Sequence, residues 1–130
     1  ACAAYDSADR DAVKAIKQET GGGVYAVVDF VGSEASTNFA RRCLRRGGRL
    51  IVVGLFGGGL SIDLPLIPLT GLSIIGSITG SLSEAEEVLA LAKQGKIDPI
   101  PIEERPMDQA NASLEDLRAG RIVGRVVLTP

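Results

Sequence analysis

Hydrophobic and polar positions follow one another along the chain in blocks that predict helices and strands in turn. Residues 7–20 open with polar capping residues and then place Ala12, Val13 and Ile16 on one side at helical spacing. Residues 24–32 form a continuous apolar run rich in β-branched side chains, which predicts a strand buried on both faces of a parallel sheet. The chain is therefore expected to begin with a helix that leads into a buried strand.

The same alternation continues through the middle of the chain. Residues 33–46 carry apolar side chains at intervals of three and four, so they predict a helix that a Gly-Gly pair closes. Residues 49–55 repeat the strand pattern. Residues 60–71 form an irregular apolar segment, in which two prolines are expected to exclude a regular helix, and a strand follows over roughly residues 72–78.

The last third of the chain predicts two helices and two strands. Residues 81–97 have the clearest helical pattern, with Ser81 or Ser83 as the cap, acidic residues in the first turn, and Gly95 at the end. The segments after it are an extended stretch interrupted by prolines (99–106), a short helix with Ala110, Leu114 and Leu117 inward (107–121), and a closing strand (122–130).

This order of elements predicts the class of fold. Parallel strands need crossover connections that usually carry a helix, so the alternation implies a parallel sheet covered by helices. The sequence therefore predicts an α/β fold with a parallel sheet flanked by helices and a short C-terminal strand-helix-strand tail. Pro99, Pro101 and Pro106 mark a change of direction, and we expect the tail to belong to a different sheet.

Composition and charge narrow the class of protein. With 130 residues, 45% hydrophobic and 23% charged, the chain has the size and apolar content of one globular domain. Its net charge of −2 and pI near 5.1 give no general attraction for nucleic acid. Two cysteines are too few for a disulfide framework, so we expect a reduced, cytoplasmic compartment. No apolar run is long enough to span a membrane and no basic, apolar leader is seen, so we expect no membrane partner.

Candidate chemical groups are sparse. The chain has no histidine, and Cys2 and Cys43 lack the spacing of metal ligands, so we expect no metal site and no catalytic residue. Acidic residues such as Asp29 and Asp63 are expected to cap turns and to be solvated. Residues 41–49, RRCLRRGGR, are expected to form the cationic C-terminal end of a helix, where positive charge suits the helix dipole; anion binding is the alternative.

Glycines follow several of the predicted strands. Residues 21–26 match the loose dinucleotide pattern G-x-G-x-x-A, but they follow a helix and precede a strand, so they predict a helix-ending turn. Residues 54–59 follow a strand but lead to no helix, so a phosphate cradle is not expected there. Gly32, Gly54 and Gly76 end three strands, and bare strand ends side by side would form one floor of a ligand crevice. Close packing is the alternative for any single glycine.

Three segments stand in a specific order and spacing: VYAVVDFVGSEASTNFARRCLRRGGRLIVVGLFGG, LSIIGSITGS and GRVVLTP. Together they resemble the C-terminal half of the coenzyme-binding domain of medium-chain, zinc-type alcohol dehydrogenases. The resemblance implies a partial Rossmann fold, with residues 1–98 as the second half of the coenzyme domain and residues 99–130 as a return segment toward a catalytic domain that this chain lacks. The opening ACAAYD, with neither Met nor a helix cap, likewise predicts a chain cut from a longer one or processed.

The resemblance also implies a partial site for NAD or NADP. Val31 is implied on the adenosine side, Val53 and Leu55 near the nicotinamide ring, and Arg125 near the pyrophosphate. Main-chain groups are implied to meet the carboxamide. The full implied set of coenzyme-binding residues is Val31, Gly32, Val53, Gly54, Leu55, Ser77, Thr79 and Arg125.

The function predicted on this basis is that of a fragment of an NAD(P)-dependent alcohol dehydrogenase, inactive alone, which contributes the nicotinamide-side wall of the coenzyme site and a dimer interface. Zinc belongs to the parent family, but this chain is expected to hold none of its ligands. The apolar residues 64–78 are expected to pair subunits into a homodimer or higher oligomer. One alternative is a non-catalytic dimerisation or partner-binding α/β module. Another is a complete flavodoxin-type domain, against which the missing phosphate-binding first loop counts.

Overall fold

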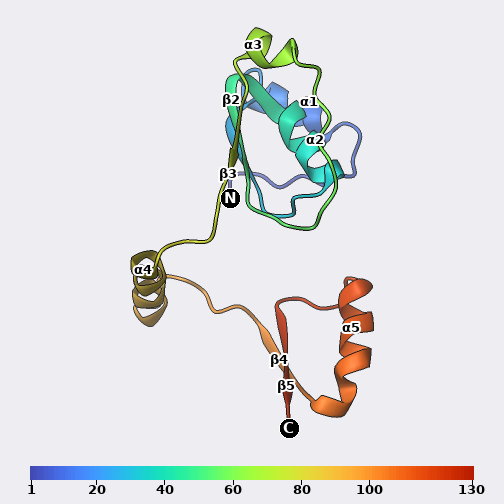
Figure 1. The fold of residues 1–130 in the computed structure, drawn as a ribbon, viewed down its shortest axis with the longest axis vertical. Helices are drawn as coiled ribbons and strands as arrows, with labels where there is room; N and C mark the ends of the chain where they lie inside the picture. Colours follow the sequence, from blue (N-terminus) through green and yellow to red (C-terminus); the bar gives the residue numbers. More distant parts are fainter. The chain divides into compact units, whose positions relative to one another are not determined.

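The computed structural model describes all 130 residues, which form two compact units, Ala1–Thr79 and Gly80–Pro130 (Figure 1). Unit 1 contains α1 (Ala12–Glu19), β1 (Val24–Asp29), α2 (Glu34–Cys43), β2 (Leu44–Val52), α3 (Leu66–Thr70) and β3 (Ser73–Gly76). Unit 2 contains α4 (Leu82–Lys93), β4 (Ile102–Pro106), the 3-10 turn η1 (Met107–Gln109), α5 (Ala110–Arg118) and β5 (Arg125–Thr129). The predicted division at residue 98 concerns the domains of a longer protein and stays a prediction.

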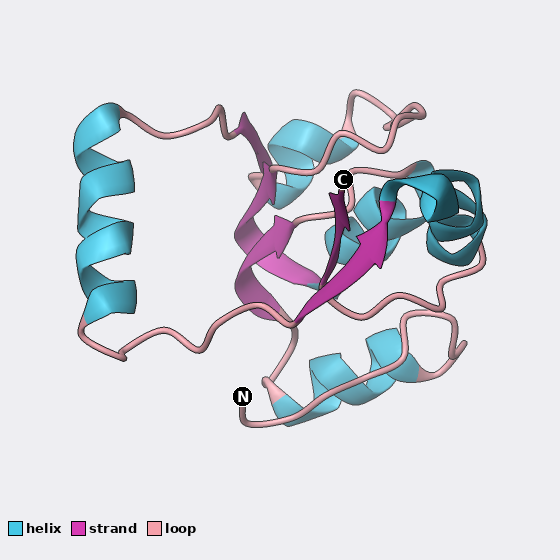
Figure 2. Ribbon diagram, turned by 90° about the horizontal axis from the view of Figure 1, so that it is seen from below, coloured by secondary structure: helices cyan, strands magenta, loops and turns pink.

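The strands of unit 1 form one parallel sheet in the order β1-β2-β3. Helix α2 packs against β1 and β2, and α1 packs against α2. Figure 2 distinguishes these helices from the strands by colour. At the carboxyl ends of the strands, Asp29 is level with Val52, and Val52 is level with Gly76. The predicted α/β class, a parallel sheet flanked by helices, is confirmed.

The core of unit 1 lies between α2 and the sheet. Leu50 is fully buried and packs with Ala40 and Leu44. Val28 of β1 stays exposed, so the prediction that the first strand is buried on both faces was wrong. Helix α2 is the helix that packs against β1, and a single helix covers only one face of a strand.

The junction between α2 and β2 differs from the prediction that the helix continues to residue 46. The helix ends at Cys43, and Leu44 is extended, pairs with Val24 and is buried in the core. Burial of this leucine outweighs the helix propensity of the arginines around it. The next pair of residues is Ala26 with Arg49, so residues 45–48 form a bulge in β2.

Prolines do not exclude a helix between β2 and β3, contrary to expectation. Helix α3 follows Pro65 and includes Pro68 in its first turn. A proline is tolerated there because the N–H groups of the first turn have no partner within the helix. Gly71, with a φ of 63°, ends α3, and the N–H of Leu72 donates to the carbonyl of Ile67 (3.1 Å).

The first residues of α4 and α1 test the predictions made from capping residues. Helix α4 begins at the predicted Ser81 cap, whose side chain accepts from the N–H of Glu84 while the Glu84 carboxylate accepts from the N–H of Ser81. Helix α1 begins at Ala12, later than predicted. The carboxylates of Asp6 and Asp9 each accept a backbone N–H two residues on, and these turns delay the helix.

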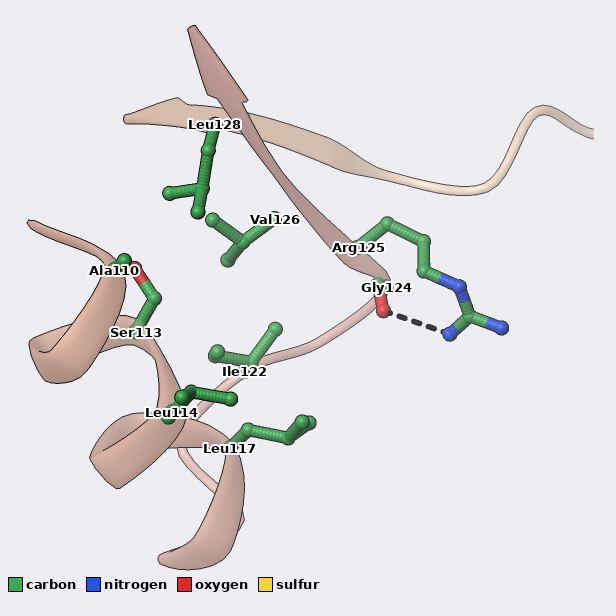
Figure 3. A pocket seen from close by; sticks show the side chains of 9 residues that line it. All are labelled: Ala110, Ser113, Leu114, Leu117, Ile122, Gly124, Arg125, Val126 and Leu128. Atoms are coloured by element: carbon green, nitrogen blue, oxygen red, sulfur yellow. Dashed lines mark hydrogen bonds between the residues drawn. The ribbon is translucent and has the colours of Figure 1, made fainter. Parts of the chain in front are cut away.

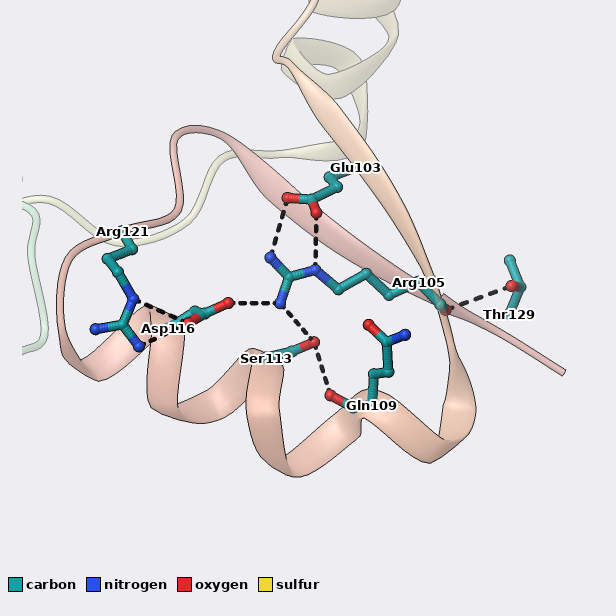
Figure 4. Close-up of polar contacts among 7 residues, drawn as sticks. All are labelled: Glu103, Arg105, Gln109, Ser113, Asp116, Arg121 and Thr129. Carbon is teal, nitrogen blue, oxygen red and sulfur yellow. Dashed lines mark hydrogen bonds and ion pairs between the residues drawn. The ribbon is translucent and has the colours of Figure 1, made fainter.

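Unit 2 is built around a second parallel pair, β4 with β5, which confirms that the tail belongs to a different sheet. Arg105 of β4 donates to Glu103 (2.9 Å), Asp116 (2.7 Å) and Ser113 (3.3 Å), as Figure 4 shows. Arg121 donates to the other oxygen of Asp116 (2.6 Å). Hydrogen bonds from Arg105 and Arg121 lower the pKa of Asp116, so its carboxylate stays charged and ties α5 to β4.

Candidate functional site

The carboxyl ends of the three strands of unit 1 meet at one edge of the sheet. The N–H groups of Val53 and Gly54 both donate to the carbonyl of Asp29 (2.9 and 3.0 Å), which ties the end of β2 to the end of β1. The N–H of Ser77 donates to the carbonyl of Val52 (2.9 Å), which ties the end of β3 to the end of β2. The glycines that follow these strands therefore lie at the same edge.

Packing of main chain on main chain explains two of the three glycines. A Cβ atom built on Gly32 would collide with the backbone of Gly54, and a Cβ on Gly54 would collide with Val31 and Gly32. Gly32 also has a φ of +67°, which side chains rarely adopt. A Cβ built on Gly76 meets no atom within 4 Å. Of these three glycines, only Gly76 therefore leaves open space.

Asp29 holds the turn that leads from β1 into α2. Its carboxylate accepts from the N–H groups of Val31 and Gly32 (both 3.0 Å) and from the hydroxyl of Ser36 (2.9 Å). Burial raises the pKa of this carboxyl, but the hydrogen bonds lower it by more, so its pKa lies below the ordinary value. Asp29 caps the turn as predicted but is 5% exposed, so the expectation that it is solvated was wrong.

Sequence reasoning predicted the cap but missed that Asp29 is buried beneath the turn. An acidic residue at the end of a buried strand, just before a glycine and a helix-capping serine, is the signal that could have shown it. Ser33 caps α2, and its own N–H donates to the Ser36 hydroxyl (3.0 Å). The turn is thus fixed by polar contacts from both sides.

The other predicted coenzyme-binding residues of unit 1 flank this edge. Val31 and Leu55 are exposed, Leu55 at 97%, and Val53 is half-buried. Because the N–H groups of Val53 and Ser77 are already bonded within the sheet, the carbonyl oxygens are the only main-chain groups of these two residues left to bind another molecule. Thr79 is exposed and follows β3 in the last residues of unit 1.

Arg125, the remaining predicted residue, belongs to unit 2. It begins β5, is exposed, and donates to the carbonyl of Gly124 (3.2 Å). Figure 3 shows its guanidinium extending away from an apolar groove of about 390 Å³ between α5 and β5. The side chains on the walls of that groove include Leu114, Leu117, Ile122, Val126 and Leu128. Leu114 and Leu117 face it as predicted, yet both remain more than half exposed.

The residues of this chain do not fit a zinc site. Nowhere do three side chains of His, Cys, Asp or Glu gather closely enough to hold a metal ion. Cys43 is buried, and burial raises the pKa of its thiol although Lys17 and Arg42 act to lower it. Cys2 is exposed. No step that uses zinc follows from these residues.

None of the helices has both the length and the apolar character needed to cross a membrane.

Comparison with known proteins places this geometry in a family. Residues 1–94 match the family model described as zinc-binding dehydrogenase. The NAD-dependent alcohol dehydrogenase of Sulfolobus acidocaldarius is 39% identical over 125 residues, which cover 95% of this chain and 36% of that protein. The D-arabinose 1-dehydrogenase (NADP(+)) of Saccharolobus solfataricus is 35% identical over 127 residues, which cover 97% of this chain and 36% of that protein.

This chain is also similar to a solved structure of an alcohol dehydrogenase. The crystal structure of the alcohol dehydrogenase from Aeropyrum pernix matches 93% of this chain and 35% of its own length, with a TM-score of 0.83 and 38% identity. The chain spans about a third of the length of the relatives that it matches. The resemblance to the zinc-type alcohol dehydrogenases is confirmed, and the chain belongs to the zinc-binding dehydrogenase family.

Proposed function

We propose that this chain supplies the nicotinamide-side wall of the coenzyme site in an NAD(P)-dependent alcohol dehydrogenase and has no dehydrogenase activity by itself. The observation that carries the proposal is the meeting of three strand ends at one edge, with open space at Gly76. Ligands of open parallel sheets bind outside the carboxyl ends of the strands. A bound coenzyme supplies hydride transfer, and the chain supplies a surface that orients it.

The residues predicted to bind coenzyme suit the parts of a dinucleotide. Val53 and Leu55 are proposed to pack near the nicotinamide ring, and Val31 toward the adenosine. The carbonyl oxygens of Val53 and Ser77 are proposed to accept from the carboxamide N–H₂, because their own N–H groups are bonded within the sheet. Thr79 is proposed to contribute main-chain groups only. Arg125, an exposed cation, is proposed to approach the pyrophosphate.

The open space at Gly76 gives a sharp test in the complete reading frame that contains this chain. Gly76→Val adds a side chain whose Cβ meets no protein atom within 4 Å. We expect it to raise the KM for NAD(P) at least about tenfold, since it fills the space proposed for coenzyme. Gly59→Val is the matched control, because Gly59 also has open space around it. Equal coenzyme KM values for the two variants would contradict the proposal.

The inactivity of the chain alone is tested with the purified 130 residues. We expect no reduction of NAD or NADP with simple alcohols, because no side chains gather here that could hold a metal to stabilise an alkoxide. The complete reading frame, assayed beside it, is the positive control. Measurable turnover by the chain alone would overturn this part of the proposal.

We further propose that residues 64–78 pair subunits into a homodimer or higher oligomer. Strand β3 is an edge strand, and Leu64, Leu69 and Ile78 are exposed nearby. Ile75→Lys is expected to shift the chain toward monomer in light scattering, whereas Val88→Lys, on exposed α4, is not. A wild-type chain that stays monomeric at high concentration would contradict the pairing. The alternative of a non-catalytic dimerisation module keeps this pairing but predicts no activity of the complete reading frame.

The division of the chain is part of the same proposal. Residues 1–98 form the second half of a Rossmann coenzyme domain in a cytoplasmic enzyme, and residues 99–130 return toward its catalytic domain. The groove between α5 and β5 supports this, since apolar side chains line it and stay exposed. Leu117→Lys should therefore destabilise the complete protein but not the chain alone. Equal destabilisation of the complete protein and of the chain alone would contradict the proposal that residues 99–130 return toward a catalytic domain.

A further inference from the structure

A basic pocket of about 260 Å³ lies at the opposite edge of the sheet, where the strands begin. Its walls include the cationic side chains of Lys17, Arg41, Arg45 and Arg46. Leu66 and Leu72 supply apolar surface. No acidic residue lines the pocket, and no carboxylate of unit 1 pairs with these four cations. The pocket therefore concentrates positive charge in a chain whose net charge is −2.

Two local features position Arg45, and the first of them also positions Arg46. Residues 45–48 form the bulge in β2, which carries Arg45 and Arg46 out of the ladder. The guanidinium of Arg45 lies over the ring of Tyr25, 5.0 Å from its centroid. Arg41 reaches the pocket from the last turn of α2. The positive charges thus come from three elements that the fold itself brings together.

The Nε atom of Arg41 is buried and has no hydrogen-bond partner. An atom that water cannot reach is equally closed to an oxyanion, so this Nε would not itself contact a ligand in the pocket. A bound oxyanion would instead meet the terminal N–H groups of the cationic residues that line the pocket.

The helix dipoles do not cancel this charge. Helices α1 and α2 end beside the pocket, and each C-terminus carries about half a negative charge. Two such ends offset roughly one of the four cations. The remaining repulsion among the cations is relieved when a multiply charged anion binds between them.

We propose that this pocket binds a phosphate-type oxyanion, either the free ion or the phosphate group of a small ester whose organic part lies against Leu66 and Leu72. Arginine matches the geometry of phosphate oxygens through paired N–H groups, and three arginines with one lysine suit a doubly charged ligand. The site uses none of the residues proposed for coenzyme binding, so it stands independently of that proposal.

The test is a titration of the full chain with inorganic phosphate at constant ionic strength, followed by backbone amide NMR. We expect saturable shifts at residues 41–46 and 72, and none at residues 53 and 77. Arg41→Gln should weaken binding about tenfold or more, because it removes a charged hydrogen-bond donor. Arg42→Gln is the matched control: it lies next along the same helix, is exposed, and does not line the pocket.

Two outcomes would overturn the site. One is the lack of saturable shifts, and the other is an equal loss of affinity in Arg41→Gln and Arg42→Gln, which would show attraction by net charge alone. If Arg41→Gln does not fold, Arg46→Gln replaces it, because Arg46 is exposed and lines the pocket. Phenyl phosphate distinguishes the two sources: tighter binding than inorganic phosphate indicates an ester, and equal binding indicates the free ion.

Discussion

Each of the two units of this chain is stabilised internally by a different kind of contact. Unit 1 has a buried apolar core of Ala40, Leu44 and Leu50 beneath a three-stranded sheet. Every buried apolar residue of the structure lies in that unit, whereas the buried residue of unit 2 is Ser113. Unit 2 is organised by the Arg105 network and one strand pair. Apolar burial therefore dominates the first unit and polar contacts the second.

The two units therefore depend to different degrees on contacts with the rest of a protein. A unit with its own apolar core keeps its fold through contacts that salt does not weaken. A unit held by partly exposed ion pairs gains less from each contact and depends more on what covers it. Three substitutions test the comparison, two by amide hydrogen exchange read separately for the two units and one by denaturation as a function of pH.

The largest effect is expected from Leu50→Ala. The side chain is fully buried, so its loss should lower the free energy of unfolding of unit 1 by about 2–5 kcal/mol. Hydrogen exchange in β1 and β2 should speed up accordingly, while β4 and β5 stay unchanged. Leu55→Ala is the control, because Leu55 is 97% exposed and should change stability by no more than about 0.5 kcal/mol. Similar losses in both units would refute separate cores.

A smaller effect is expected from Asp29→Asn. The change weakens hydrogen bonds from Val31, Gly32 and Ser36, and at neutral pH should cost unit 1 about 1–3 kcal/mol. Because the folded pKa of Asp29 is lowered, its contribution is full above about pH 4 and is lost as the pH falls toward the folded pKa.

Denaturation followed from pH 7 down to about pH 2 checks this sign. The variant should differ most from wild type at neutral pH and converge with it in acid. Asp63→Asn, at an exposed position, is the control and should follow the wild-type curve. A constant gap between Asp29→Asn and wild type at every pH would assign the loss to packing alone.

The smallest effect is expected from Arg105→Met, and it falls on unit 2. The methionine keeps apolar contacts but removes the donors to Glu103, Ser113 and Asp116, so exchange in β4 and α5 should speed up. In wild type, 1 M NaCl should have a similar effect on unit 2 only, since it shortens the Debye length to about 3 Å. Arg118→Met, an exposed residue of α5, should change neither unit. Salt sensitivity confined to unit 1 would reverse the comparison.

The sequence allowed prediction of the fold wherever local signals agreed with burial. The apolar run of β1, the Ser81 cap of α4 and the prolines before β4 all gave the right element or sheet. Prediction was wrong where a tertiary contact decided the outcome. Leu44 leaves the predicted helix because the core buries it, and Pro68 is accepted because it falls in a first turn.

The candidate site shows the same limit. Glycine at three strand ends predicted a shared edge, and the strand registers place Gly76 level with Val52. What the sequence did not show is that Gly32 and Gly54 fill each other's space, or that Asp29 is buried beneath the turn. The basic pocket depends on a bulge of residues 45–48, and local helical spacing gave no sign of it.

The contact between Gly32 and Gly54 matters for surveys of related genes. Because each backbone occupies the place of the other's side chain, selection for folding alone should retain both glycines. A related protein that no longer binds a nucleotide coenzyme would therefore still carry both glycines. Gly76, which nothing in the protein crowds, is the position where drift to larger residues would first report that loss.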